Sequence, residues 1–216
     1  MRTIFVGDIH GCAEEFQEIL STSGYRKGTD RLLLTGDAFS KGPDPFGIWR
    51  LILETGAQMV VGNHDAELVE LIAGTREPDE GQATTLAQID EVKEELSLWL
   101  EVQSLYIREM DFILVHAGIH PEKGLDRTRR EEFLAIRTWP PTDGIEGPRW
   151  HDHFEPIDGK VVVFGHDAPG GLVHKKRPKS DTTYLVGLDT GCVYGGALTA
   201  YILEQDDFVQ VESKQA

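Results

Sequence analysis

Short apolar runs alternate with amphipathic stretches over the first 73 residues. Apolar runs occupy residues 2–6, 31–34 and 58–61. The stretches that follow them place apolar side chains three or four positions apart, as one face of a helix requires; they cover residues 12–22, 46–54 and 66–73. Strand, helix, strand, helix, strand is typical of a parallel sheet with right-handed crossovers.

The second half of the chain has a different pattern of apolar and polar positions. Further strands are expected at residues 105–108, 112–115, 160–164, 183–188, 197–203 and 208–211. The first two and the last two of these are close enough in sequence to form hairpins. Residues 121–156 look irregular, with one short helix near 130–136. Long irregular segments inside compact domains are often functional.

The region between these halves follows neither pattern. Residues 74–85 are polar and contain Gly and Pro, which predicts a loop, and residues 86–103 have the spacing of a longer helix. We therefore expect one domain over residues 1–216, with a helical, cap-like insertion at about 74–104.

Most of the strands that begin a motif end in a glycine followed by Asp, Asn or His. A carboxyl end of a strand opens onto the crevice where α/β sheets bind ligands. Carboxylate, amide oxygen and imidazole are ligands for divalent cations. The candidate ligands are Asp8, His10, Asp37, Asn63, His116 and His166. One such placement is commonly a turn or cap residue, but their repetition in one chain favours a metal site.

Composition and charge narrow the function further. With 216 residues, 40% of them hydrophobic, the chain can bury one sizeable core. It has neither an apolar run approaching the ~18 residues of a membrane span nor a signal segment, so a cytoplasmic protein without a membrane partner is expected. The formal charge of −16 disfavours nucleic-acid binding. Of the two cysteines, Cys12 is interpreted as a small buried residue, with a ligand or nucleophile as the alternative.

In order along the chain, the motifs resemble those of the calcineurin-like metallophosphoesterases. The residues that carry this resemblance are Gly7-Asp8-Ile9-His10-Gly11, Gly36-Asp37, Gly62-Asn63-His64-Asp65, His116-Ala117-Gly118 and Gly165-His166. The chain is most similar to the phosphoprotein-phosphatase branch and its bacterial symmetrical diadenosine tetraphosphatase relatives. This resemblance implies a mixed α/β fold, a four-layer α/β/β/α β-sandwich with a dinuclear metal site at its strand ends.

The resemblance also implies how the ligands are shared. Asp8, His10 and Asp37 would hold one ion. The second ion would be held by Asp37, Asn63, His116 and His166, so that Asp37 bridges the pair. Manganese is the leading expectation for both ions, with Fe, Zn, Co or Mg as alternatives.

Two such ions would supply the chemistry. Ions ~3.5–4 Å apart lower the pKa of a bridging water and stabilise both oxygens of an in-line displacement. The nucleophile is then a metal-bridging hydroxide, with Asp37 as the catalytic bridge. His64, next to Asn63, is placed to protonate the leaving oxygen, and the resemblance supports that role over a structural one.

Four positions near these motifs carry further expectations. In the related protein phosphatases, Asp and Arg stand where this chain has Ser40 and Lys41. Ser40 cannot give His64 a carboxylate partner, whereas Lys41 keeps a positive charge for phosphate binding. Arg149 resembles a second phosphate-binding arginine. Asp189, in a stretch that also resembles the tetraphosphatases, is expected to orient an active-site loop.

The leading functional hypothesis is symmetrical hydrolysis of diadenosine tetraphosphate to two ADP, which makes a dinucleoside polyphosphate the partner. The alternative is a Ser/Thr or broad-specificity protein phosphatase that uses the same site on a phosphorylated substrate. An inactive nucleotide sensor is a third hypothesis, against which the complete ligand set argues. The basic run at residues 174–179 is either a solvated loop or a guide for a polyphosphate tail.

Overall fold

The computed structural model describes residues 1–141 and 144–215, and within these ranges the strands form two five-stranded sheets. The first sheet has the order β10-β9-β1-β2-β3. Its parallel part consists of β1 (Thr3–Val6), β2 (Arg31–Leu34) and β3 (Gln58–Met59). The antiparallel hairpin of β9 (Ala197–Ile202) and β10 (Asp207–Glu212) extends it beyond β1.

The second sheet has the order β4-β5-β6-β8-β7. Its parallel centre is formed by β5 (Phe112–Val115), β6 (Val161–Phe164) and β8 (Thr183–Gly187). The two edge strands, β4 (Tyr106–Arg108) and β7 (Val173–Lys176), run antiparallel to their neighbours.

Side-chain alternation along the strands explains how the two sheets pack. Successive residues of a strand point to opposite faces of its sheet. Phe5 of β1 and Leu114 of β5 meet in an apolar cluster between the sheets. Their neighbours Ile4 and Val115 belong to two other clusters, one on the outer face of each sheet. Three apolar layers between four structural layers are what a sandwich flanked by helices requires.

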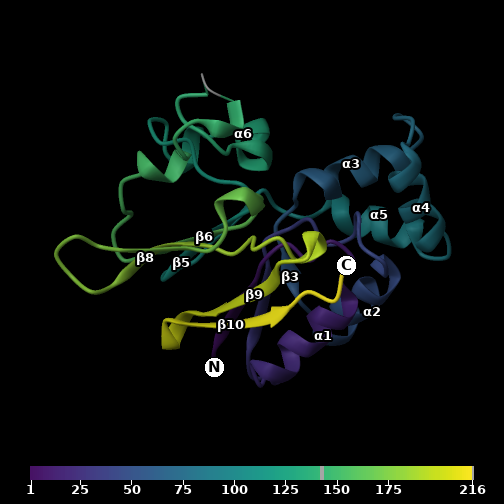
Figure 1. Ribbon diagram of the computed structural model, residues 1–216, viewed down its shortest axis with the longest axis horizontal. Helices are drawn as coiled ribbons and strands as arrows, with labels where there is room; N and C mark the ends of the chain where they lie inside the picture. Colours follow the sequence, from purple (N-terminus) through teal and green to yellow (C-terminus); the bar gives the residue numbers. More distant parts are fainter. Residues whose placement is uncertain (142–143, 216) are drawn as a thin grey trace.

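Helices cover the outer faces. α1 (Ala13–Thr22) and α2 (Pro45–Thr55) pack into the apolar cluster outside the first sheet, and α6 (Arg130–Ala135) contributes Phe133 to the cluster outside the second. α3 (Asn63–Ile72), α4 (Glu80–Gln88) and α5 (Lys93–Glu101) lie together at one end of the molecule (Figure 1). The mixed α/β sandwich predicted from the motifs is therefore confirmed. Among the described helices, none has the length and apolarity needed to cross a bilayer.

The predictions for residues 74–103 were wrong in two respects. The predicted loop over 74–85 contains the start of α4, and the predicted helix over 86–103 is divided between α4 and α5. Asp79 begins α4 with a capping box, in which its side chain accepts from the Gln82 amide at 2.8 Å. Ile89, just after the end of α4, and Leu96 of α5 are both fully buried in the core.

The basic run at residues 174–179 begins in a strand rather than in a solvated loop. Its first three residues lie in the edge strand β7. Lys175 pairs with Asp152 at 2.7 Å, and Lys176 pairs with Asp181 at 2.9 Å. These two lysines are therefore partly neutralised by neighbouring carboxylates.

Candidate metal centre

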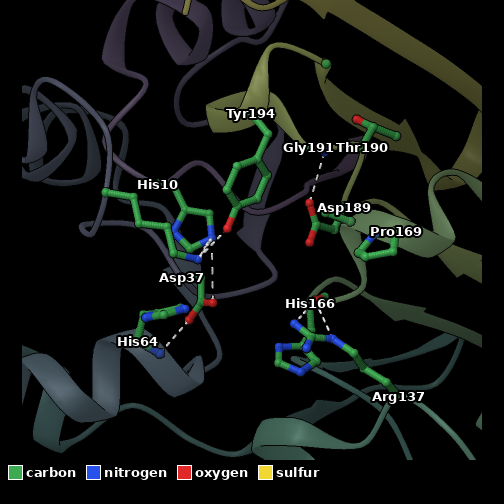
Figure 2. Close-up of a pocket in the computed structure, with 13 residues that line it drawn as sticks. His10, Asp37, His64, Arg137, His166, Pro169, Asp189, Thr190, Gly191 and Tyr194 are labelled. Atoms are coloured by element: carbon green, nitrogen blue, oxygen red, sulfur yellow. Dashed lines mark hydrogen bonds and ion pairs between the residues drawn. The ribbon is translucent and has the colours of Figure 1, made fainter. Parts of the chain in front are cut away.

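Side chains from both sheets converge on one cavity of about 460 Å³. Figure 2 shows His10, Asp37 and His64 together on one side of it, and His166 and Arg137 on another. His10, Asp37, His64 and His166 follow β1, β2, β3 and β6, so the carboxyl ends of these strands meet here, as the sequence predicted; Arg137 follows α6.

Two groups of candidate ligand atoms share one residue, Asp37. In one group, atoms of Asp8, His10 and Asp37 all lie within 4.8 Å of one another, and atoms of Asp37, His116 and His166 do the same in the other. All five side chains are buried. The first triplet is the first ligand set that the resemblance implied, and the second triplet is the second set without Asn63; Asp37 belongs to both.

In the second group, the hydrogen bonds leave several acceptor atoms close together without a donor between them. Nδ1 of His116 donates to the Thr35 carbonyl at 2.8 Å, which in the neutral ring leaves Nε2 as an acceptor. That Nε2 lies 3.1 Å from Oδ1 of Asn63 and 3.6 Å from Oδ2 of Asp37, all of them acceptors in this tautomer. Nε2 of His166 is buried without a hydrogen-bond partner among the described residues. A cation among these atoms would satisfy them, so the donor set fits a metal ion.

The backbone is held in uncommon conformations to bring these groups together. His10, Asp37 and His166 have φ angles of 47°, 52° and 69°, in the left-handed region that side-chain-bearing residues rarely adopt. Such strain gathers at functional sites. Gly165 is required for a different reason, because a Cβ there would lie 1.9 Å from Oδ1 of Asp8.

Electrostatics in this centre also favour a bound cation. Burial raises the pKa of Asp8 and Asp37 well above the ordinary value. Burial lowers the pKa of His10 well below the ordinary value and that of His166 to about 2. Both effects express the cost of burying charge. A divalent cation would offset that cost for the carboxylates, and it binds imidazole in the unprotonated form that burial already favours.

Asp65 is a positioning residue to which the sequence analysis gave no role. Its buried carboxylate accepts hydrogen bonds from the amides of Asp37 (2.6 Å), Ala38 (3.0 Å) and Gly62 (3.0 Å). It therefore ties the loop after β2 to the start of α3. An acidic residue three positions after the helix N-cap is a capping signal that the sequence does contain.

His64 has a carboxylate neighbour that the sequence analysis did not identify. Its Nδ1 lies 3.5 Å from Oε2 of Glu67, one helical turn along α3. Arg76 holds the other oxygen of Glu67 at 2.8 Å. Ser40 instead lies 3.0 Å from Nδ1 of His10. Ser40 is thus no partner of His64, as expected, and the neighbouring carboxylate comes from Glu67 instead. Burial, followed by the charge of Lys41, lowers the pKa of His64 to about 4.

The positive charges are arranged differently from the expectation. Lys41 lines the cavity, with its Nζ 3.4 Å from Nε2 of His10 and 2.9 Å from the Tyr194 hydroxyl. Arg149 is not among the residues that line it; its guanidinium pairs with Asp167 at 2.7 Å. Arg137 lines the cavity instead and donates to the His166 carbonyl at 3.0 Å. The phosphate contact of Arg149 stays a prediction.

Asp189 and the cysteines complete the surroundings. Oδ1 of Asp189 accepts from the Gly191 amide at 3.1 Å, within the loop that carries Tyr194 to the cavity rim (Figure 2). This geometry agrees with a loop-orienting role, which no further observation tests. Cys12 is buried beside Glu15 and Cys192 in another compact group of candidate ligand atoms, but none of these three lines the cavity.

Comparisons with known proteins agree with this geometry. The sequence profile of the calcineurin-like phosphoesterases matches residues 1–180. A symmetrical bis(5'-nucleosyl)-tetraphosphatase from Nitrosomonas europaea is 29% identical, with 98% of each chain covered. One of the same name from Vibrio campbellii is 35% identical, with 92% of this chain and 94% of the relative covered.

A comparison with solved structures agrees with the sequence comparisons. A crystal structure described as a candidate diadenosine tetraphosphatase superposes with a TM-score of 0.81 at 31% identity, covering 100% of this chain and 95% of the other. The sequence profile, the full-length relatives and this superposition together show that the chain belongs to the calcineurin-like phosphoesterase family, whose members are metal-dependent phosphohydrolases.

Proposed function

We propose that this protein hydrolyses dinucleoside polyphosphates, with diadenosine tetraphosphate cleaved symmetrically to two ADP as the leading substrate. The observation that carries the proposal is the pair of ligand groups joined at Asp37. The tetraphosphatase names of its full-length relatives support the substrate class.

Two divalent metal ions, with manganese as the leading candidate, would occupy the centre. Asp8, His10 and Asp37 would hold one ion. Asp37, Asn63, His116 and His166 would hold the other. When bound, the ions would neutralise phosphate oxygens and lower the pKa of water, which is the chemistry that metal pairs supply to hydrolases.

Other side chains of the cavity bind the substrate and donate a proton to its leaving group. Lys41 and Arg137 line the cavity and supply the positive charge that a polyphosphate needs in a chain of net charge −16. His64 would protonate the leaving oxygen. Glu67 faces Nδ1 of His64, orients the ring and favours its protonated form once an anionic substrate is beside it.

A substrate panel with manganese-loaded enzyme tests this function. We expect diadenosine tetraphosphate to be hydrolysed to ADP alone, with a kcat/KM well above those of phosphopeptides and inorganic polyphosphate. Asp37→Asn should abolish the hydrolysis and serves as the control for contaminating phosphatases. Rapid hydrolysis of phosphopeptides with the dinucleotide left intact would instead identify a protein phosphatase. Failure to hydrolyse any phosphoester or anhydride would identify a non-catalytic nucleotide-binding protein.

A further inference from the structure

A second cavity, of about 390 Å³, adjoins the candidate metal centre. It lies against α6 and the segment that follows this helix. Arg137 belongs to the walls of both cavities, and its guanidinium reaches the His166 carbonyl on the side of the metal centre. A ligand could therefore occupy the second cavity and extend past Arg137 to the metals.

The lining of this second cavity is mainly apolar and includes one large aromatic ring. Trp139 is half-buried, and its ring centroid lies 4.1 Å from that of His120. Ile136 and Ile145 add aliphatic surface. Glu131, whose side chain is exposed, places a carboxylate at the rim. A supported indole beside aliphatic surface suits a flat heteroaromatic ring, and a carboxylate accepts hydrogen bonds from sugar hydroxyls.

We propose that this cavity binds the nucleoside end of a nucleoside polyphosphate. The base packs against Trp139, and the phosphate chain passes Arg137 toward the metal centre. The argument for this occupant is continuity with the candidate metal centre together with charge. A ligand that is apolar at one end and anionic at the other matches Trp139 in the second cavity and Arg137 between the two cavities. The inference rests on the proposed function and adds to it a specificity-determining residue, Trp139.

Competition against a simple substrate tests the inference. Inhibition of p-nitrophenyl phosphate hydrolysis is measured with ADP and with pyrophosphate, at fixed free manganese. Because stacking of a base on an aromatic side chain favours binding, we expect the Ki of ADP to be about tenfold lower than that of pyrophosphate. Trp139→Ala should raise the Ki of ADP about tenfold and leave the Ki of pyrophosphate unchanged. Trp139→Phe should keep most of the difference between the two Ki values.

Tyr184→Ala is the matched control. Tyr184 and Trp139 are both half-buried against the apolar cluster outside the second sheet, but Tyr184 lies outside both cavities. This variant should change neither Ki. Equal Ki values for ADP and pyrophosphate in the wild-type protein would overturn the inference without any variant. So would a Trp139→Ala protein that binds both more weakly, or one whose Ki for ADP is unchanged. Hydrolysis of diadenosine tetraphosphate is followed separately, so failure of the proposed function alone remains visible.

Discussion

At the scale of single residues, the centre depends on backbone positions as much as on its ligands. Asp37 is both the shared carboxylate and a residue in the left-handed region. Its amide is held by Asp65, and its Oδ1 accepts from the His64 amide at 2.9 Å. Asp37 is therefore held in place by hydrogen bonds of the protein itself.

Asp65→Ala should destabilise the protein by about 3 kcal/mol, because it leaves buried amides without their acceptor. Urea unfolding measures this change, and the same preparation should bind manganese more weakly. Asp79→Ala is a suitable control, since Asp79 caps an exposed helix end and its loss should cost about 1 kcal/mol without affecting the metals. Equal losses in the two variants would show that Asp65 is only a helix cap.

His64→Ala should affect substrates according to their leaving groups. Phenolate, with a conjugate-acid pKa of about 10, leaves poorly without a proton, and removal of a general acid typically costs about a hundredfold. We expect kcat to fall by about that factor for phenyl phosphate and much less for p-nitrophenyl phosphate. Glu67→Gln should give the same pattern more weakly. Glu70→Gln, an exposed position on the same helix, should leave both rates unchanged. A uniform loss for both substrates would argue against proton donation by His64.

At the scale of secondary structure, the sequence predicted the strands better than the helices that join them. The strands that end at candidate ligands are short apolar runs, and the sequence predicted the positions of these strands to within a few residues. The division between α4 and α5 escaped prediction because one apolar spacing continues through both helices. Strand β7 escaped because its lysines and histidine resemble a solvated loop, although His174 lies 2.7 Å from the Thr183 hydroxyl of β8 and Lys175 pairs with Asp152.

Asp30 links the start of β1 to the loop before β2. Its buried carboxylate accepts from Nη2 of Arg2 at 2.6 Å and from the Arg26 amide at 3.0 Å. The hydrogen bond from Arg2 is the main reason that the pKa of Asp30 falls to about 2. Asp30→Asn should therefore destabilise the protein at pH 7 by about 2 kcal/mol.

The pH dependence of this difference has a defined sign. The pKa of an unfolded aspartate is about 3.9, so the folded protein holds the proton less readily than the unfolded chain does. The stabilisation by Asp30 is fully present above about pH 4 and is lost as the pH falls toward 2. Melting temperatures of wild type and Asp30→Asn should converge over that window. Asp126→Asn, at an exposed ion pair, should show little difference at any pH. A gap for Asp30→Asn that persists at pH 2 would contradict this account.

At the scale of the whole molecule, the centre exists only because the two sheets meet. Oδ2 of Asp8, after β1, accepts from the His166 amide, after β6, at 2.9 Å. The motifs predicted that such residues would gather, since each follows a strand. They could not predict contacts made by fold-level packing, such as the placement of Arg137 rather than Arg149 on the cavity wall or the approach of Glu67 to His64.

The central claim is that one carboxylate, Asp37, joins two metal sites. Anomalous diffraction from a manganese-loaded crystal tests it most directly, with Asp37→Asn crystals treated in the same way. We predict two manganese peaks on either side of the Asp37 carboxylate, one near Asp8 and His10 and the other near His116 and His166, and loss of at least one peak in Asp37→Asn. A single peak, or two peaks of unchanged height in the variant, would contradict the account.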